Sequence, residues 1–194
     1  MKILVLHLSL LFLSFSINAK QVFLGPSNNS QEEIQEALID LEPGDILTLK
    51  PGEYFFEDGL SLDIDDVIFE GSGIDETILN FENQMSGAQG LLVTSNGVTI
   101  RDFAVLDAKG DAIKVIGADG IKMIRLRTEW TGGPKETNGA YGFYPVESKD
   151  VLIDGCVAIG ASDAGIYVGQ SQNIIVKNSI AQYNVAGIEI ENSF

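Results

Sequence analysis

The sequence predicts an all-β parallel β-helix, a solenoid in which short strands wind into coils that stack on one another. One four-residue pattern, a small residue followed by an apolar, a variable and an inward-packing one, recurs at 112–115, 142–145, 165–168 and 187–190. β-branched triplets advance in step with it, at 98–100, 121–123, 151–153 and 174–176. Gly, Asn, Asp and Ser separate these runs, and two registers that advance together by about 22 residues are typical of stacked coils.

The first nineteen residues have the features of an export signal. Lys2 gives the positive start, residues 3–17 form an apolar stretch, and Ala19 is a small residue at the expected cleavage point. The apolar stretch is short for a transmembrane helix. We therefore expect an exported protein, periplasmic or extracellular, with a signal peptide at 1–19 and one β-helix domain at 20–194; an uncleaved N-terminal anchor is the alternative.

Removal of this signal would leave 11 basic and 28 acidic residues, because Lys2 is lost with it. The one histidine, His7, would also be lost, so the domain could not use histidine for proton transfer or as a metal ligand. A strongly acidic surface also argues against nucleic acid as a partner. The single cysteine, Cys156, can form no internal disulfide and lies among core-type residues, which favours a buried, inert thiol over a nucleophile.

The N-terminal half predicts a cap followed by short strands. Residues 27–40 are expected to form an amphipathic helix, in which Ser30 caps the start with Glu33 three residues later. Such a helix would cover the first coil and prevent pairing with other chains. The strands expected after it are 46–49, 53–56, 60–64, 67–69 and 77–81.

The entry to the domain resembles right-handed β-helix proteins of the pectate-lyase type, in the segments 34–38, 43–46, 51–54, 71–73 and 77–79. This resemblance implies a single-stranded, right-handed solenoid, and it covers lyases, hydrolases, epimerases and non-enzymatic adhesins alike. No closing helix or polar cap precedes the end at Phe194. We therefore expect that C-terminal coils and a cap are missing; a partner or a second copy that covers the last coil is the alternative.

Alternation along the recurring strands predicts a stripe of outward side chains. Lys114, Tyr144, Tyr167 and Glu189 would lie one above another, about 4.8 Å apart, while their neighbours point into the core. Aromatic faces flanked by charged ends would suit a saccharide. An exposed aromatic ladder that only stabilises the sheet is an equal alternative.

The coil between the second and third triplets is longer than its neighbours, and the extra residues fall around 129–138. An inserted loop often forms the wall of a binding cleft. This one contains the only tryptophan, Trp130, which would either close over a bound saccharide or fold back over apolar coil surface.

The segment 141–147 resembles alginate C5-epimerases, in which Tyr-Gly-Phe is followed by Asp-Pro-His and an acidic residue. Tyr144 and Val146 stand where that family has its aspartate and histidine, so its catalytic assignment does not transfer. The resemblance implies abstraction of the sugar C5 proton. Tyr144 could serve as the base if a cation lowered its pKa, with Lys114, Arg125 or Arg127 neutralising a substrate carboxylate.

Acidic side chains offer a second chemistry. Asp111, Glu147, Asp163 and Glu189 lie near the recurring strands, and two of them facing one groove could serve as a hydrolase acid and base. Our candidate catalytic residues are therefore Tyr144, Glu147 and Asp163. The run 63–66 could bind calcium as a cofactor, but it lacks a fixed loop motif, and solvated turn acids are the expected alternative. No residue is assigned as a metal ligand.

Later coils resemble an uncharacterised group of exported bacterial parallel β-helix repeat proteins, in the segments 160–170, 173–174 and 187–189. This resemblance implies export and a solenoid, and supplies no activity. The leading hypothesis is a carbohydrate-active or carbohydrate-binding protein that acts on or holds an acidic polysaccharide, such as a polyuronate. As an enzyme it would be a lyase, a C5-epimerase or a glycoside hydrolase. The rival is a non-catalytic periplasmic or surface protein that works with another exported partner.

Overall fold

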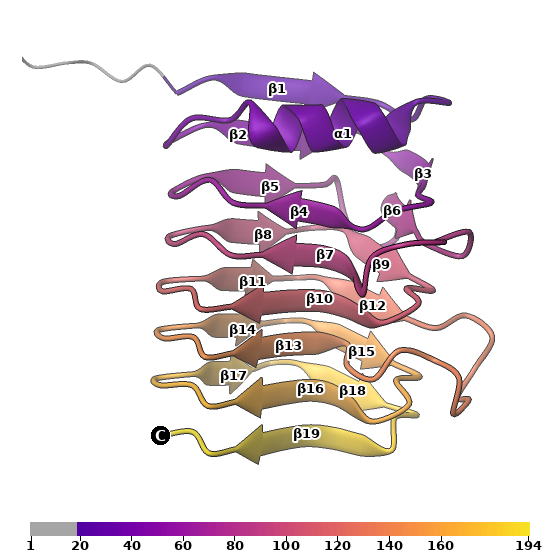
Figure 1. Ribbon diagram of the computed structural model, residues 1–194, viewed down its shortest axis with the longest axis vertical. Helices are drawn as coiled ribbons and strands as arrows, with labels where there is room; N and C mark the ends of the chain where they lie inside the picture. Colours follow the sequence, from indigo (N-terminus) through magenta and orange to yellow (C-terminus); the bar gives the residue numbers. More distant parts are fainter. Residues whose placement is uncertain (1–18) are drawn as a thin grey trace, which may run out of the picture.

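Short strands wind into stacked coils along one axis, as the repeats predict (Figure 1). The structure is a computed structural model that describes residues 19–194, so the predicted export signal lies outside the described residues except for Ala19. After β1, which belongs to the first of them, the coils contribute one strand to each of three parallel sheets, called here A, B and C in the order in which a coil visits them. No helix among residues 19–194 is long and apolar enough to cross a bilayer.

The three sheets divide the strands as follows. Sheet A contains β1 (Gln21–Leu24), β2 (Ile46–Leu49), β5 (Ile68–Glu70), β8 (Thr99–Arg101), β11 (Lys122–Ile124), β14 (Leu152–Asp154) and β17 (Ile175–Lys177). Sheet B contains β3 (Gly52–Phe55), β6 (Thr77–Asn80), β9 (Ala104–Leu106), β12 (Arg127–Glu129), β15 (Val157–Ile159) and β18 (Ile180–Gln182). Sheet C contains β4 (Leu60–Leu62), β7 (Gln89–Val93), β10 (Asp111–Ile116), β13 (Phe143–Val146), β16 (Ala164–Gly169) and β19 (Ala186–Glu191). The triplets belong to sheet A and the four-residue patterns to sheet C.

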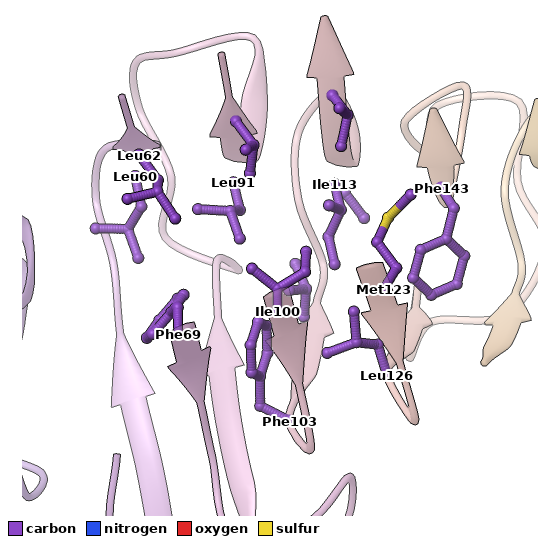
Figure 2. Close-up of a cluster of buried hydrophobic side chains, with 14 of the residues drawn as sticks. Leu60, Leu62, Phe69, Leu91, Ile100, Phe103, Ile113, Met123, Leu126 and Phe143 are labelled. Carbon is purple, nitrogen blue, oxygen red and sulfur yellow. The ribbon is translucent and has the colours of Figure 1, made fainter. Parts of the chain in front are cut away.

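The interior is a continuous apolar core formed by the inward side of every strand. Figure 2 shows Leu91, Ile113 and Phe143 of sheet C facing Ile100 and Met123 of sheet A. All five side chains are fully buried. Because side chains on a strand alternate between its two sides, their outward neighbours share the other face of each sheet.

Aromatic side chains extend this core by stacking from one coil to the next. The rings of Phe56 and Phe81 are stacked with centroids 4.8 Å apart, and those of Phe69 and Phe103 lie 5.0 Å apart. These contacts join aromatic side chains of successive coils within the core.

The predicted capping helix is present as α1 (Ser30–Ile39) and covers the first coils at the N-terminal end (Figure 1). Its inward side chains, Ile34 and Leu38, are buried in the core. The predicted cap is wrong in detail, because Asn29 holds the N-cap position with no side-chain cap. Ser27, rather than Ser30, reaches Glu33, and its hydroxyl donates to the carboxylate at 2.8 Å.

From β8 onward, two residues separate the strands at the corner between sheets A and B, and the first of them has a left-handed backbone. Asp102 and Asn178 occupy this corner with φ values of 61° and 52°. Asn and Asp adopt this left-handed conformation more readily than most other residues, which explains why they recur there. From β8 onward, the coils therefore turn from sheet A into sheet B at the same point.

The last coil exposes side chains that its predecessor buries. Ile188 and Ile190 pair with Ile166 and Val168 of the preceding coil, which are 0% and 1% exposed. Ile188 and Ile190 themselves are 50% and 66% exposed, because no described residue packs over them. The expectation of further coils beyond this one stays a prediction.

Candidate functional site

The predicted outward stripe is present on sheet C. Backbone pairing places Lys114 of β10 beside Tyr144 of β13, and Tyr167 of β16 beside Glu189 of β19. Tyr144 and Tyr167 occupy matching positions, since their neighbours Phe143 and Ile166 are paired. All four side chains point away from the core and are partly exposed. The register predicted from spacing alone is therefore the register of the sheet.

A third tyrosine joins the two in the stripe. Tyr141 immediately precedes the turn into β13, and its ring centroid lies 4.7 Å from that of Tyr144 and 4.6 Å from that of Tyr167. Tyr144 and Tyr167 meet edge to face at 5.2 Å. These distances are those of favourable aromatic pairs. The three rings, called here the tyrosine cluster, form one continuous aromatic surface.

Neighbouring groups hold the tyrosine cluster in place. The ring of Tyr167 lies across the backbone of Gly169, so close that a Cβ there would lie 2.7 Å from a ring carbon. The Tyr167 hydroxyl donates a hydrogen bond to the carboxylate of Glu191 in the next coil. The Tyr167 ring is therefore held both by the backbone beneath it and at its hydroxyl.

Charged side chains border the cluster, and most of them are acidic. Asp111 and Lys114 lie on β10, and the Lys114 ammonium sits over the Tyr144 ring, 4.6 Å from its centroid. The remaining border is formed by Glu147 after β13, Asp163 before β16, and Glu189 and Glu191 on β19. An ammonium over an aromatic face is a favourable cation–π contact. Lys114 is thus engaged with the cluster itself.

The environment raises the pKa values of the tyrosines. Burial, followed by the charge of Asp163, raises the pKa of Tyr141 to about 12. Burial and then the carboxylates of Asp111 and Glu147 raise the pKa of Tyr144, and the hydrogen bond to Glu191 raises that of Tyr167. A base role for Tyr144 required a lowered pKa, so that condition is not met.

Asp111 on this face has a raised pKa. Burial is the largest cause of the shift, and it outweighs the opposing effects of Lys114 and of a backbone hydrogen bond at Tyr141. A carboxyl group that holds its proton more tightly than usual can act as an acid. The sequence placed Asp111 among the acidic candidates but gave no reason to prefer it.

The two candidate arginines lie elsewhere. Arg125 occupies the corner after β11, between sheets A and B, and its guanidinium makes two 2.7 Å hydrogen bonds with Asp102. Arg127 lies on sheet B, where it pairs with Glu129 and with Asp75 at 3.4 Å. Neither arginine lies on sheet C. The expectation that they neutralise a substrate carboxylate at Tyr144 is therefore wrong, because their side chains belong to other faces of the solenoid.

Trp130 has the structural role that was weighed against sugar binding. Its side chain is 4% exposed, and its indole N–H donates to the carbonyl of Ala108 at 2.8 Å. The loop between β12 and β13 returns to the coils through Asn138, whose amide donates to Gly133 and Gly160 carbonyls at 2.9 and 2.6 Å. The tryptophan ring therefore offers no open face to a ligand in this structure.

This loop borders two shallow hollows at the corner between sheets B and C. Lys135 lines both of them, one beside Trp130 and the other beside Tyr183 of the last coil. Neither hollow includes a member of the tyrosine cluster. The loop therefore shapes the neighbouring corner, while its final residues deliver Tyr141 to the cluster.

The acidic run at 63–66 makes turn contacts. Asp63 accepts a hydrogen bond from the Thr94 hydroxyl and Asp65 from the Asn96 backbone, both at 2.7 Å. Residues 19–194 contain no group of three or more His, Cys, Asp or Glu side chains placed to hold a metal ion. Calcium binding stays a prediction without an assigned site.

Sequence reasoning missed Tyr141 and Glu191. It followed a single column of paired residues, whereas Tyr141 lies three positions before that column and Glu191 two positions after it. The signal that could have found them is the pair of aromatic residues three apart at 141 and 144, together with the alternate acids at 189 and 191. Cys156, in contrast, is buried as predicted, and burial raises its pKa to about 11.

Solved structures with this fold include several enzymes of larger size. The alginate lyase from Paenibacillus sp. str. FPU-7 has a TM-score of 0.50 at 14% identity, with 90% of this chain and 65% of that chain covered. The catalytic domain of a GH87 α-1,3-glucanase, solved with tetrasaccharides, has a TM-score of 0.61 at 16% identity, with 82% of this chain and 30% of that chain covered. Pectate lyase Pel9A has a TM-score of 0.55 at 16% identity, with 87% of this chain and 55% of that chain covered. The chain spans less than two thirds of each, and identities this low establish a shared fold.

Family membership comes from the sequence itself. No curated protein matches the chain. The sequence profile described as "Right handed beta helix region" matches residues 63–194, which is more than half of the chain. Those residues run from the end of β4 through β19. The chain therefore belongs to the right-handed β-helix family.

Proposed function

We propose that this protein holds a polysaccharide against the tyrosine cluster of sheet C. One observation carries the proposal: three tyrosine rings, with centroids 4.6 to 5.2 Å apart, form one surface bordered by charged side chains. Aromatic faces pack against the apolar faces of sugar rings, and carboxylates accept hydrogen bonds from hydroxyls. An extended chain of sugars could follow the stripe from coil to coil.

The similar structures support a saccharide as the ligand class. Their names describe an alginate lyase, a glucanase solved with tetrasaccharides and a pectate lyase. All share the coil architecture, and none shares enough sequence to assign a reaction to this chain. An acidic polysaccharide would have Lys114 as its nearest cation on this face, already placed over Tyr144.

Binding without catalysis is the form of the proposal that the site favours. The sequence contains no histidine beyond position 7, and the surrounding acids and burial raise the pKa of Tyr144 instead of lowering it. A tyrosine that stays protonated at neutral pH can donate a hydrogen bond to a sugar oxygen but is a poor base.

Glycoside hydrolysis is a second candidate, favoured by the raised pKa of Asp111. A hydrolase needs one protonated carboxyl group and one ionised partner on the two sides of the scissile bond. Asp111 would be the acid, and Glu147 or Asp163 the partner. On this candidate, Asp111→Asn removes all release of reducing ends without removing saccharide binding.

The experiment measures binding and turnover together. The protein is titrated with alginate, pectate and neutral oligosaccharides, while reducing ends, unsaturated-product absorbance and C5 stereochemistry are followed. We expect retention of at least one saccharide, and Tyr144→Ala and Tyr167→Ala should each weaken it by about three- to tenfold. Phe23→Ala removes an aromatic ring that is 55% exposed on sheet A and serves as the matched control. Equal loss in all three variants, or no retention of any saccharide, would refute the proposal.

A further inference from the structure

We propose that the tyrosine cluster selects saccharides that carry positive charge, that is, polymers of amino sugars with free amines. This inference rests on the proposed function and names its substrate class. It replaces the expected polyuronate with a ligand of opposite charge.

The border of the cluster carries five carboxylates from four successive coils. Asp111 belongs to β10, Glu147 follows β13, Asp163 precedes β16, and Glu189 and Glu191 belong to β19. Glu191 accepts a hydrogen bond from the Tyr167 hydroxyl, and the charge of Asp163 helps to raise the pKa of Tyr141. A ligand lying on the rings would therefore meet carboxylates along its length.

The basic side chain seen on the cluster is already engaged. Lys114 lies over the Tyr144 ring, with its ammonium 4.6 Å from the centroid. The two arginines expected to assist it lie on other walls, where Arg125 pairs with Asp102 and Arg127 with Glu129. A uronate placed on the cluster would face five like charges with one cation, and like charges at contact distance disfavour binding.

An ammonium group on each sugar reverses this balance. It is attracted by the neighbouring carboxylates, and aromatic faces bind cations in their own right, as Lys114 already demonstrates on Tyr144. The sugar ring supplies the apolar face for stacking, and its amine supplies the charge. The same surface can therefore use both halves of an amino sugar.

Three oligosaccharide probes of equal length test the charge preference. They are chitosan oligosaccharides with free amines, their fully N-acetylated neutral counterparts, and alginate oligosaccharides with carboxylates. Affinities are measured by calorimetry at low salt and at 0.15 M salt, with and without calcium. We expect the free-amine probe to bind about tenfold tighter than the neutral one, and to lose much of that advantage as salt screens the charges.

Matched charge variants locate the preference. The double variant Glu189→Gln with Glu191→Gln removes two border carboxylates from β19, and we expect it to reduce the free-amine advantage by about three- to tenfold. Asp40→Asn with Glu42→Gln removes the same net charge near α1, from two exposed positions, and should leave the advantage unchanged. Circular dichroism and melting curves confirm that both double variants remain folded.

The outcomes separate this inference from the proposed function. Equal affinity for the free-amine and neutral probes would overturn the inference and leave saccharide binding intact. Tighter binding of alginate, with or without calcium, would overturn it in favour of the polyuronate. Free-amine binding that is reduced equally by both double variants would show a general attraction to an acidic protein, and would also overturn it. Retention of none of the probes would count against the proposed function itself.

Discussion

Burial raises the pKa of Asp111 on sheet C. Folding therefore tightens proton binding at this side chain relative to the unfolded chain, whose Asp pKa is about 3.9. As pH rises through that value and up to the raised pKa, the folded state loses stability relative to the unfolded state. At neutral pH the ionised carboxylate is thus a cost to folding that an amide would not carry.

We expect Asp111→Asn to be more stable than the wild type at pH 7, and this advantage to shrink as pH falls through about 3.9, because Asp111 of the wild type then becomes protonated in both the folded and the unfolded state. Denaturant unfolding across this pH range measures it. Asp150→Asn is the control, and we expect it to be less stable than the wild type at pH 7. A hydrogen bond from Asn173 lowers the pKa of Asp150, so the ionised carboxylate of Asp150 stabilises the folded state. An Asp111→Asn variant that is less stable than the wild type at pH 7 would contradict the assignment.

At the scale of elements, the loop between β12 and β13 depends on one glycine for its return to the coils. A Cβ on Gly139 would lie 1.6 Å from the Gly110 carbonyl oxygen and 2.7 Å from the Trp130 ring. Neither obstacle can move cheaply, because one is backbone and the other is a buried side chain. The close approach of two coils therefore requires a residue without a side chain.

Gly139→Ala should destabilise the protein by about 3 kcal/mol through this overpacking. Gly187→Ala is the control, since the nearest atom to its Cβ would lie at an ordinary 3.9 Å. Chemical denaturation measures both, with Trp130 as the fluorescent reporter of unfolding. A Gly139→Ala variant as stable as Gly187→Ala would show that the loop can relax away from its neighbours.

The elements were the part of the structure that sequence spacing predicted best. Inward residues recur at each coil because the core demands them, so the register of Lys114, Tyr144 and Tyr167 follows from counting. The spacing of residues in the sequence does not determine the conformation of a long side chain or the contacts made by its end. The contact of Tyr141 with the other rings depends on a turn and on side-chain conformations, and the arginines were misassigned because their wall was not identified.

At the scale of the whole molecule, the net charge limits which partners the protein can bind. The full chain has a formal net charge of −16, which favours solubility and disfavours polyanionic partners. We propose that residues 1–19 direct the chain out of the cytoplasm and are removed there. The described domain begins at this boundary, with β1 starting at Gln21.

Expression of the full chain in a bacterium with two membranes tests this proposal. We expect periplasmic or secreted protein whose first residue is Lys20, as determined by intact-mass spectrometry. Ala19→Arg should block cleavage, because the site needs a small residue there. Recovery of an unprocessed chain beginning at Met1 from the cytoplasm would contradict export.

The inserted loop has a consequence for engineering. Backbone pairing on both sides of it is undisturbed, since Arg127 still faces Val157 and Phe143 still faces Ile166. Residues 134–137 could therefore be exchanged for a foreign peptide while Asn138, Tyr141 and the strands beyond them keep their positions. Such a graft would be displayed beside the aromatic face on a rigid support, and variants of it could be screened without redesigning the solenoid.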